Sequence, residues 1–101
     1  MIMEAVILNV RPGEEHEFED AFGEAKAIIA AARGFESLRL LRCHETKARY
    51  LLLVEWATLE DHTVGFRGSA AFDAWRAMLH HFYEPMPTVE HFEPYVGIVA
   101  D

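Results

Sequence analysis

Residues 50–56, Tyr-Leu-Leu-Leu-Val-Glu-Trp, restrict the fold of this chain more than any other segment. From Tyr50 to Val54 apolar side chains point to both sides of what its composition predicts to be a β-strand. A strand with one wet face alternates apolar and polar residues, so this run indicates a strand that is covered on both faces. Helices of the same chain can cover one face. We expect the sheet of a second copy, related by a two-fold axis, to cover the other.

Three more segments have the composition of strands. The first ends at Arg-Pro-Gly, where Pro12 removes a backbone donor and Gly13 allows a turn. Two strands joined by the polar stretch around His-Glu-Thr-Lys-Ala are predicted to form a hairpin. The predicted strands are residues 3–10, 35–43, 49–56 and 88–99.

Helical periodicity separates these strands. Apolar residues at three- and four-residue spacing predict a helix over 14–32, with Gly34 as its C-terminal cap. Thr58 is the predicted N-cap of a short helix that runs to about Arg67, and Ser69 caps a second piece. The order β-α-β-β-α-β predicts an α+β protein with a ferredoxin-like antiparallel sheet, helices on one face, and a single domain over residues 1–101.

Charge and composition exclude several classes of function. Seventeen acidic residues against nine basic ones give a net charge of −8, which opposes binding to nucleic acid. The first ten residues lack the basic start of a signal peptide and a run long enough to span a membrane, so we expect no membrane association. The single cysteine, Cys43, fits a reducing compartment, and we expect a cytoplasmic protein.

Three stretches resemble one known family over essentially the whole chain. "AVILNV", "VEWATLEDH" and "GFRGSAAFDAWRAMLHHFYEPMPTVEHF" are similar to the antibiotic biosynthesis monooxygenase family of dimeric α+β barrel proteins. The resemblance implies a homodimer joined through the sheet faces. It also implies one of several activities, because the family includes cofactor-free oxygenases of phenols and quinols, haem-degrading enzymes and members of unknown substrate.

The haem-degrading branch is the less favoured of these. Its pattern is an Asn from the first strand, a Trp from the broken helix and a His further along as iron ligand. Asn9 fits the first place, but Phe66 and Arg76 stand where the Trp and the His are expected. We therefore expect no haem, and the absence of a Gly-rich phosphate loop predicts no flavin or nucleotide cofactor.

His62 is the first candidate catalytic residue. It shares a helical stripe with Leu59 and Phe66, the face that should turn toward the sheet or a cavity. There it is either a core histidine bonded to a carbonyl or a general base for a phenol, since imidazole titrates near neutral pH. Asn9 is the candidate to hold the developing oxyanion.

The remaining candidates lie toward the C-terminus. His91, on the last predicted strand, is the alternative base, although the face it points to is not evident from sequence. The candidate substrate-binding residues are Phe66, Trp75, Tyr83 and His81. His80 and His81 point about 100° apart on a helix and do not form a ligand pair. A mixed site of His81, His91 and Glu84 stays open, but its spacing matches no common zinc pattern, and we expect no metal.

Two hypotheses follow from these residues. The first is a cofactor-independent monooxygenase that acts on a small aromatic substrate, in which an electron-rich phenolate itself reduces oxygen. The protein then has to bind the ring, remove a proton and exclude water. The second is a non-catalytic dimer of the same fold that binds a small ligand or serves as a stress-response module. Both hypotheses require the dimer and a cavity.

Overall fold

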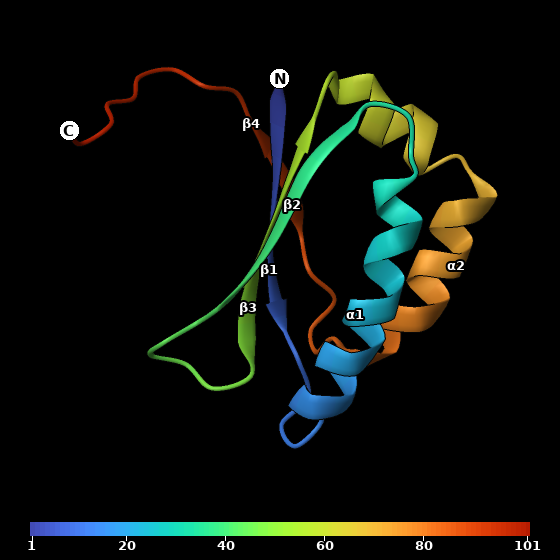
Figure 1. Cartoon of the computed structure of the whole chain (residues 1–101). Coiled ribbons are helices and arrows are strands. Elements are labelled where there is room, and N and C mark those ends of the chain that lie inside the picture. Colours follow the sequence, from blue (N-terminus) through green and yellow to red (C-terminus); the bar gives the residue numbers. More distant parts are fainter.

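The computed structural model describes all residues, 1–101, and contains one four-stranded antiparallel sheet with helices against one of its faces (Figure 1). The strands are β1 (Ile2–Asn9), β2 (Phe35–Arg42), β3 (Arg49–Trp56) and β4 (Val89–Phe92), in the spatial order β2-β3-β1-β4. The helical elements are α1 (Glu15–Ala30), the π-helix η1 (Asp61–Phe66), α2 (Ala70–Leu79) and the 3-10 helix η2 (His80–Phe82). The predicted βαββαβ order and ferredoxin-like fold are confirmed. None of the helices has the length and apolar character that crossing a membrane requires.

The second helical region is broken where the sequence predicted. Thr58 Oγ1 accepts a hydrogen bond from the amide of Asp61 at 3.1 Å, and Ser69 Oγ accepts one from the amide of Phe72 at 3.2 Å. Between these caps the Arg67 amide donates to the His62 carbonyl at 3.1 Å, a five-residue step that makes η1 a π-helix. Such helices are rare and occur often at functional sites.

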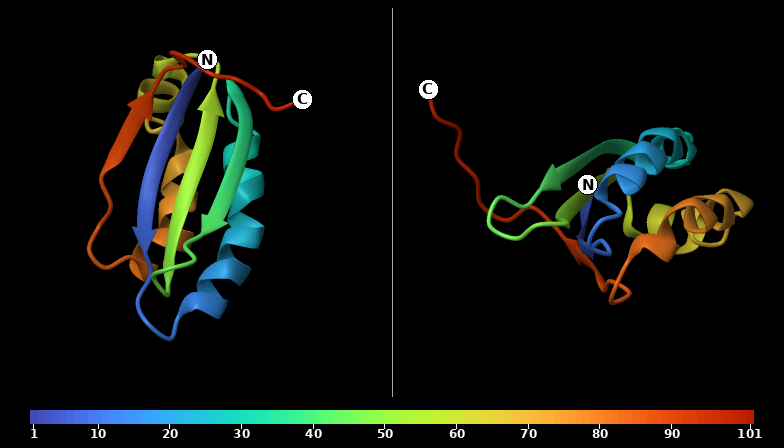
Figure 2. Two further views of the ribbon diagram at one scale, coloured as in Figure 1. Left: turned by 90° about the vertical axis from the view of Figure 1, so that its left-hand side faces the viewer. Right: turned by 90° about the horizontal axis from the view of Figure 1, so that it is seen from below.

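The helices pack on only one of the two faces of the sheet. One face packs on the helices and holds the core, in which Leu8, Val54, Phe18 and Leu79 are fully buried. No helix crosses the other face, which looks toward the viewer in the left panel of Figure 2. We call it the open face. Alternate residues of each strand therefore meet very different surroundings.

The last strand is shorter than the predicted 88–99, because β4 ends at Phe92. Its register explains the difference: Phe92 pairs with Met3 of β1, so β1 has no residues left to pair with the chain beyond Pro94. Tyr95 and the residues that follow lie outside helices and strands, and they leave the body beyond the sheet (Figure 1). The register also decides which face His91 takes, since Val89 and His91 turn toward the helices and Phe92 toward the open face.

Candidate functional site

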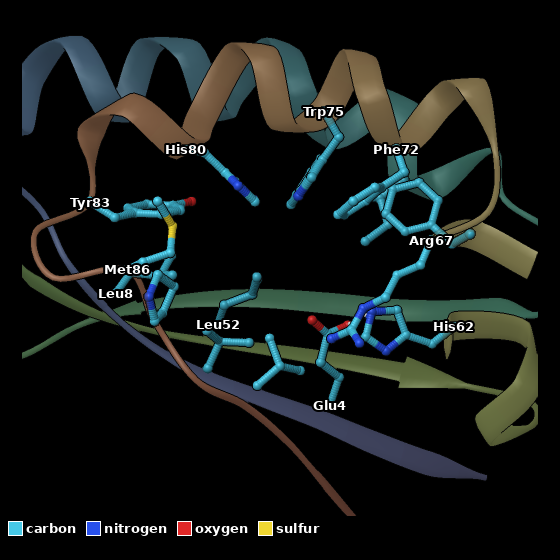
Figure 3. Close-up of a pocket in the computed structure, with 15 residues that line it drawn as sticks. Glu4, Leu8, Leu52, His62, Arg67, Phe72, Trp75, His80, Tyr83 and Met86 are labelled. Carbon is cyan, nitrogen blue, oxygen red and sulfur yellow. Dashed lines mark ion pairs between the residues drawn. The ribbon is translucent and has the colours of Figure 1, made fainter. Parts of the chain in front are cut away.

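A cavity of about 170 Å³ lies between the covered face of the sheet and the helices (Figure 3). Strands β1 and β3 form its floor, and α2 with η2 forms the opposite wall. Ten of its fifteen lining residues are hydrophobic, so its few polar groups stand out against an apolar surface. An apolar protein cavity of about 150 Å³ holds one benzene molecule, so the space fits a single aromatic ring.

Four side chains form one connected polar chain beside the floor of this cavity, and two of them, Glu4 and His62, line it. Glu4 Oε1 accepts a hydrogen bond from Trp56 Nε1 at 3.0 Å, and His62 Nε2 lies 3.4 Å from the same oxygen. His62 Nδ1 lies 2.7 Å from Nε2 of His91. The indole ring of Trp56 stacks on the His62 ring, with centroids 5.1 Å apart and 15° between the planes. Glu4, His62 and His91 are thus joined in a row.

Backbone geometry accounts for this convergence. Glu4 and His91 are register partners across β1 and β4, so their side chains stand next to each other on the covered face. Trp56 ends β3, the strand on the other side of β1. The π-helix then places His62 above them. Three separate parts of the chain are needed to build the row.

Burial decides the charges in this row. Glu4 is 5% exposed and His62 is 3% exposed. Burial raises the pKa of Glu4, against the hydrogen bond from Trp56 and the charge of Arg67, which both lower it. Burial, with the charges of Arg67 and His91, lowers the pKa of His62 to about 4. Because burial disfavours the imidazolium, the 3.4 Å approach of His62 Nε2 to Glu4 Oε1 is a polar contact of a neutral ring rather than an ion pair.

The opposite wall carries three further polar groups. Figure 3 shows His80 and the indole nitrogen of Trp75 directed across the cavity toward Glu4 and Leu52. Neither ring makes a hydrogen bond within the protein, and neither does the hydroxyl of Tyr83. Burial raises the pKa of Tyr83, so its hydroxyl stays protonated. Burial and the charge of Arg76 lower the pKa of His80, which favours its neutral ring.

The structure brings together some of the residues that the sequence singled out. His62, Phe66, Trp75 and Tyr83 all line the cavity, and His91 reaches it through its contact with His62.

Two predicted site residues lie elsewhere. Asn9 is on the open face, where its amide oxygen accepts from Arg49 Nε at 2.9 Å, so it does not share a site with His62 in this chain. His81 is exposed and packs against the Phe82 ring, because η2 turns its neighbour His80 into the cavity instead. The combination of Asn9 and His62 as one constellation, and His81 as a wall of the site, are therefore corrected.

Sequence reasoning missed Glu4, Trp56, Arg67 and His80. A signal for Glu4 was present, since in "MEAVIL" its side chain has the same parity as Val6 and Leu8, the apolar face of the strand. A carboxylate on such a face is costly unless it is partnered. The structure contains no group of three or more His, Cys, Asp or Glu side chains arranged to hold a metal ion, so His81, His91 and Glu84 do not form one.

Comparison with known proteins gives the family. Residues 1–81 match the model of the family described as "Antibiotic biosynthesis monooxygenase". "Uncharacterized protein YczJ" of Bacillus subtilis (strain 168) is 54% identical over 93 residues, which cover 92% of this chain and 98% of that protein. The chain belongs to the antibiotic biosynthesis monooxygenase family.

Two solved structures share the fold. A putative antibiotic biosynthesis monooxygenase from Bordetella bronchiseptica is 35% identical, with a TM-score of 0.89 over 94% of this chain and 97% of that one. The monooxygenase from the gene ActVA-Orf6 of Streptomyces coelicolor, solved in complex with the ligand Nanaomycin D, is 18% identical, with a TM-score of 0.83 over 99% of this chain and 92% of that one. The second similarity concerns the fold alone.

Proposed function

We propose that the protein is a cofactor-independent monooxygenase that acts on a small phenol or quinol. One observation carries the proposal: an apolar cavity the size of one ring is lined by the buried side chains of Glu4 and His62, and His62 in turn contacts the half-buried His91. Perturbed titratable groups that face a cavity are typical of sites that move protons. Membership of the family supports the same reaction class.

The proposed chemistry uses the substrate as the reductant. A phenol and one molecule of oxygen give a quinone and one molecule of water, so a ring carbon gains one oxygen atom and the other leaves as water. Removing the phenol proton starts the reaction, and the row that contains His62 and His91 supplies the proton acceptor. Trp75 and His80, on the far wall, are placed to hydrogen-bond a second substrate oxygen or a developing oxyanion.

The assembly that we propose is a homodimer joined through the open faces. Leu41, Leu51 and Ile7 are register neighbours across three strands and form an apolar row on that face. A second copy would cover this row, as the relationship to the dimeric α+β barrel family also suggests. The cytoplasm remains the proposed location, on the grounds of the single Cys43.

Oxygen uptake tests the proposed reaction. Purified protein would be given a panel of hydroquinones, catechols and monohydric phenols in air-saturated buffer, with and without a chelator, and catalase would be added at the end. We expect uptake above the rate without protein, no effect of the chelator, and no oxygen returned by catalase, because the second oxygen atom leaves as water. Oxygen returned by catalase would show peroxide release and contradict the monooxygenase.

The alternative function is a binding module of the same fold. The same cavity supports it, since it would hold a small aromatic ligand whether or not a reaction follows. It is favoured if no compound in the panel is oxidised while one of them raises the melting temperature. Haem degradation is the least supported activity, because a haem macrocycle is several times larger than the single ring that the cavity fits.

A further inference from the structure

The row on the cavity floor leaves open which of its atoms meets the substrate. His62 is the obvious base, but both of its ring nitrogens face polar atoms of the protein. Nε2 lies 3.4 Å from Glu4 Oε1, and Nδ1 lies 2.7 Å from His91 Nε2. A neutral imidazole has one N–H nitrogen and one acceptor nitrogen. A proton on Nε2, which faces the Glu4 carboxylate, leaves Nδ1 as the acceptor, and Nδ1 is already occupied by His91.

We infer that Glu4, through its second carboxylate oxygen Oε2, is the catalytic residue that takes the proton of the substrate, and that His62 and His91 are positioning residues that hold Glu4 in place. This inference rests on the proposed function, since it names the base of that same site. It replaces His62 as the group in contact with the substrate.

The two oxygens of Glu4 have different surroundings. Oε1 receives both protein contacts, from Trp56 Nε1 and from His62 Nε2. Oε2 has no hydrogen-bond partner within the protein. No fully buried side-chain nitrogen or oxygen in the structure lacks a partner, so Oε2 must border open space. Figure 3 shows one oxygen of the Glu4 carboxylate on the side of Leu52 and the cavity, and the other beside His62 and Arg67.

The hydrogen-bond directions in the row follow from this assignment. With Glu4 ionised, His62 carries its single proton on Nε2, the nitrogen that faces Oε1 at 3.4 Å. Its Nδ1 must then accept from Nε2 of His91, which fixes the tautomers of both rings. Trp56 Nε1 donates to Oε1. One carboxylate oxygen is thereby bonded by the Trp56 N–H and faced by the His62 N–H, with the lone pairs of Oε2 left for a ligand.

The proton transfer balances without another reactant. The O–H bond of the phenol breaks, its proton forms a new bond to Glu4 Oε2, and the electron pair stays on the phenolate oxygen. Glu4 becomes a neutral carboxylic acid, which its buried surroundings favour. A carboxylate in a dry site is also a stronger base than one in water, which suits a phenol better than an ordinary glutamate would.

Three substitutions separate Glu4 from His62. Glu4→Gln keeps the shape and an acceptor for Trp56 but removes the base, and His62→Gln keeps a donor of similar reach to Oε1. Glu55→Gln is the matched control, because Glu55 lies on β3 and has the opposite parity from the buried Val54 and Trp56, so it faces the open side. Thermal melting of each variant shows that it is folded before its activity is compared.

The pH profile of kcat/KM for the most active quinol distinguishes Glu4 from His62 as the base. The charged and titratable groups that face Glu4 are His62 from η1, His91 from β4, Arg67 just after η1, and His80 and Tyr83 on the opposite wall of the cavity. We expect Glu4→Gln to lower kcat/KM by about 10²–10⁴-fold and to abolish the acid limb of the profile. His62→Gln should keep that limb at a shifted midpoint, with a loss of about tenfold. An acid limb that survives in Glu4→Gln and vanishes in His62→Gln would overturn the assignment.

Binding of 4-nitrophenol tests Glu4 independently of turnover. Above the pKa of the free ligand, wild type must take up a proton to bind it, because a phenolate beside an ionised Glu4 is repelled. The affinity of wild type should therefore fall about tenfold per pH unit, and that of Glu4→Gln should fall less steeply. Equal slopes, or no binding by wild type, would overturn the inference. Binding with the expected slopes but without oxygen uptake would leave Glu4 in place and remove the monooxygenase.

Discussion

The two faces of the sheet differ from what a monomer in water would favour. The buried face carries a carboxylate, and the exposed face carries large apolar side chains. On β1, Glu4 points to the helix-covered face and is 5% exposed, while Ile7 points to the open face and is 54% exposed. The buried carboxylate costs free energy unless its partners offset it. The apolar open face loses the stabilisation that burial would give.

This contrast assigns a different role to each face. The carboxylate, the two histidines and the unbonded indole N–H around one apolar space fit the ligand-binding role that we propose for the covered face. The open face, with its register row of Leu41, Leu51 and Ile7, is best explained by contact with another protein surface. A substitution on one face should therefore weaken the role of that face and leave the other face unchanged.

Leu51→Asp should have the largest effect, because it places a charge at the centre of the apolar row on the open face. An unpaired charge in a dry interface costs about 3–5 kcal/mol, so the proposed dimer should dissociate at micromolar concentration. Light scattering should give twice the 11.5 kDa mass of one chain for wild type and the single mass for the variant.

The control for this substitution is Val64→Asp, which adds the same charge at an exposed position on η1, away from the sheet. It should leave the mass at the wild-type value. A wild type that stays monomeric would contradict the role that we give to the open face, and so would a Leu51→Asp protein that remains dimeric.

The second prediction concerns stability and pH on the covered face. The pKa of His62 is lowered from 6.5 to about 4 in the folded state, so between these values the unfolded chain binds a proton that the folded one does not. The free energy of unfolding should therefore fall as pH falls through this window, by about 2 kcal/mol from pH 7 to pH 5. His62→Gln should lose less than wild type over that interval in urea denaturation.

Glu4 acts in the opposite sense, since its raised pKa favours the folded state as pH falls. It is present in both proteins, so the difference between their slopes reports on His62. His81→Gln, at an exposed histidine of η2 outside the cavity, is the control and should follow wild type. Parallel curves for wild type and His62→Gln would mean that His62 titrates normally in the folded protein.

A smaller effect is expected at the far wall of the cavity. Trp75→Phe keeps an aromatic ring there but removes the indole N–H that faces the ligand space. One lost hydrogen bond should weaken 4-nitrophenol binding by up to about tenfold, as calorimetry would measure. Unchanged affinity would remove Trp75 from the contacts to the ligand.

The smallest effect should come from Tyr83→Phe. The Tyr83 hydroxyl has no partner within the protein, so its removal should change the free energy of unfolding by less than about 0.5 kcal/mol. Tyr50→Phe is the matched comparison, because the Tyr50 hydroxyl donates to Glu19 Oε2 at 2.6 Å and its loss should cost about 1–2 kcal/mol. Equal costs for the two would contradict this difference.

Rules that depend on nearby residues were enough to predict the order of helices and strands. Thr58 and Ser69 could be identified as caps because cap residues precede apolar periodicity, and both make the expected bonds. The apolar run on β3 predicted two apolar faces, and the structure then places Leu52 and Val54 on the buried face and Leu51 and Leu53 on the other. These features depend on residues close together in sequence.

The site could be predicted only in part, because it depends on register between distant strands. His62 was recognisable from its helical stripe, but its partner Glu4 is 58 positions away and meets it because η1 follows β3, the strand that pairs with β1. The side that Asn9 faces follows from the parity of β1, which the buried Val6 and Leu8 could have fixed. The inward turn of His80, rather than His81, needed the geometry of η2.

The most direct test of the account is the position of a bound phenol relative to the two faces. Leu51 and Leu52 are adjacent on β3, and only Leu52 lines the cavity. With methyl-labelled protein and 4-nitrophenol, we expect nuclear Overhauser contacts from the ring protons of the ligand to the methyl groups of Leu8 and Leu52. Contacts to Leu51 and Ile7 instead would place the ligand on the open face and contradict the account.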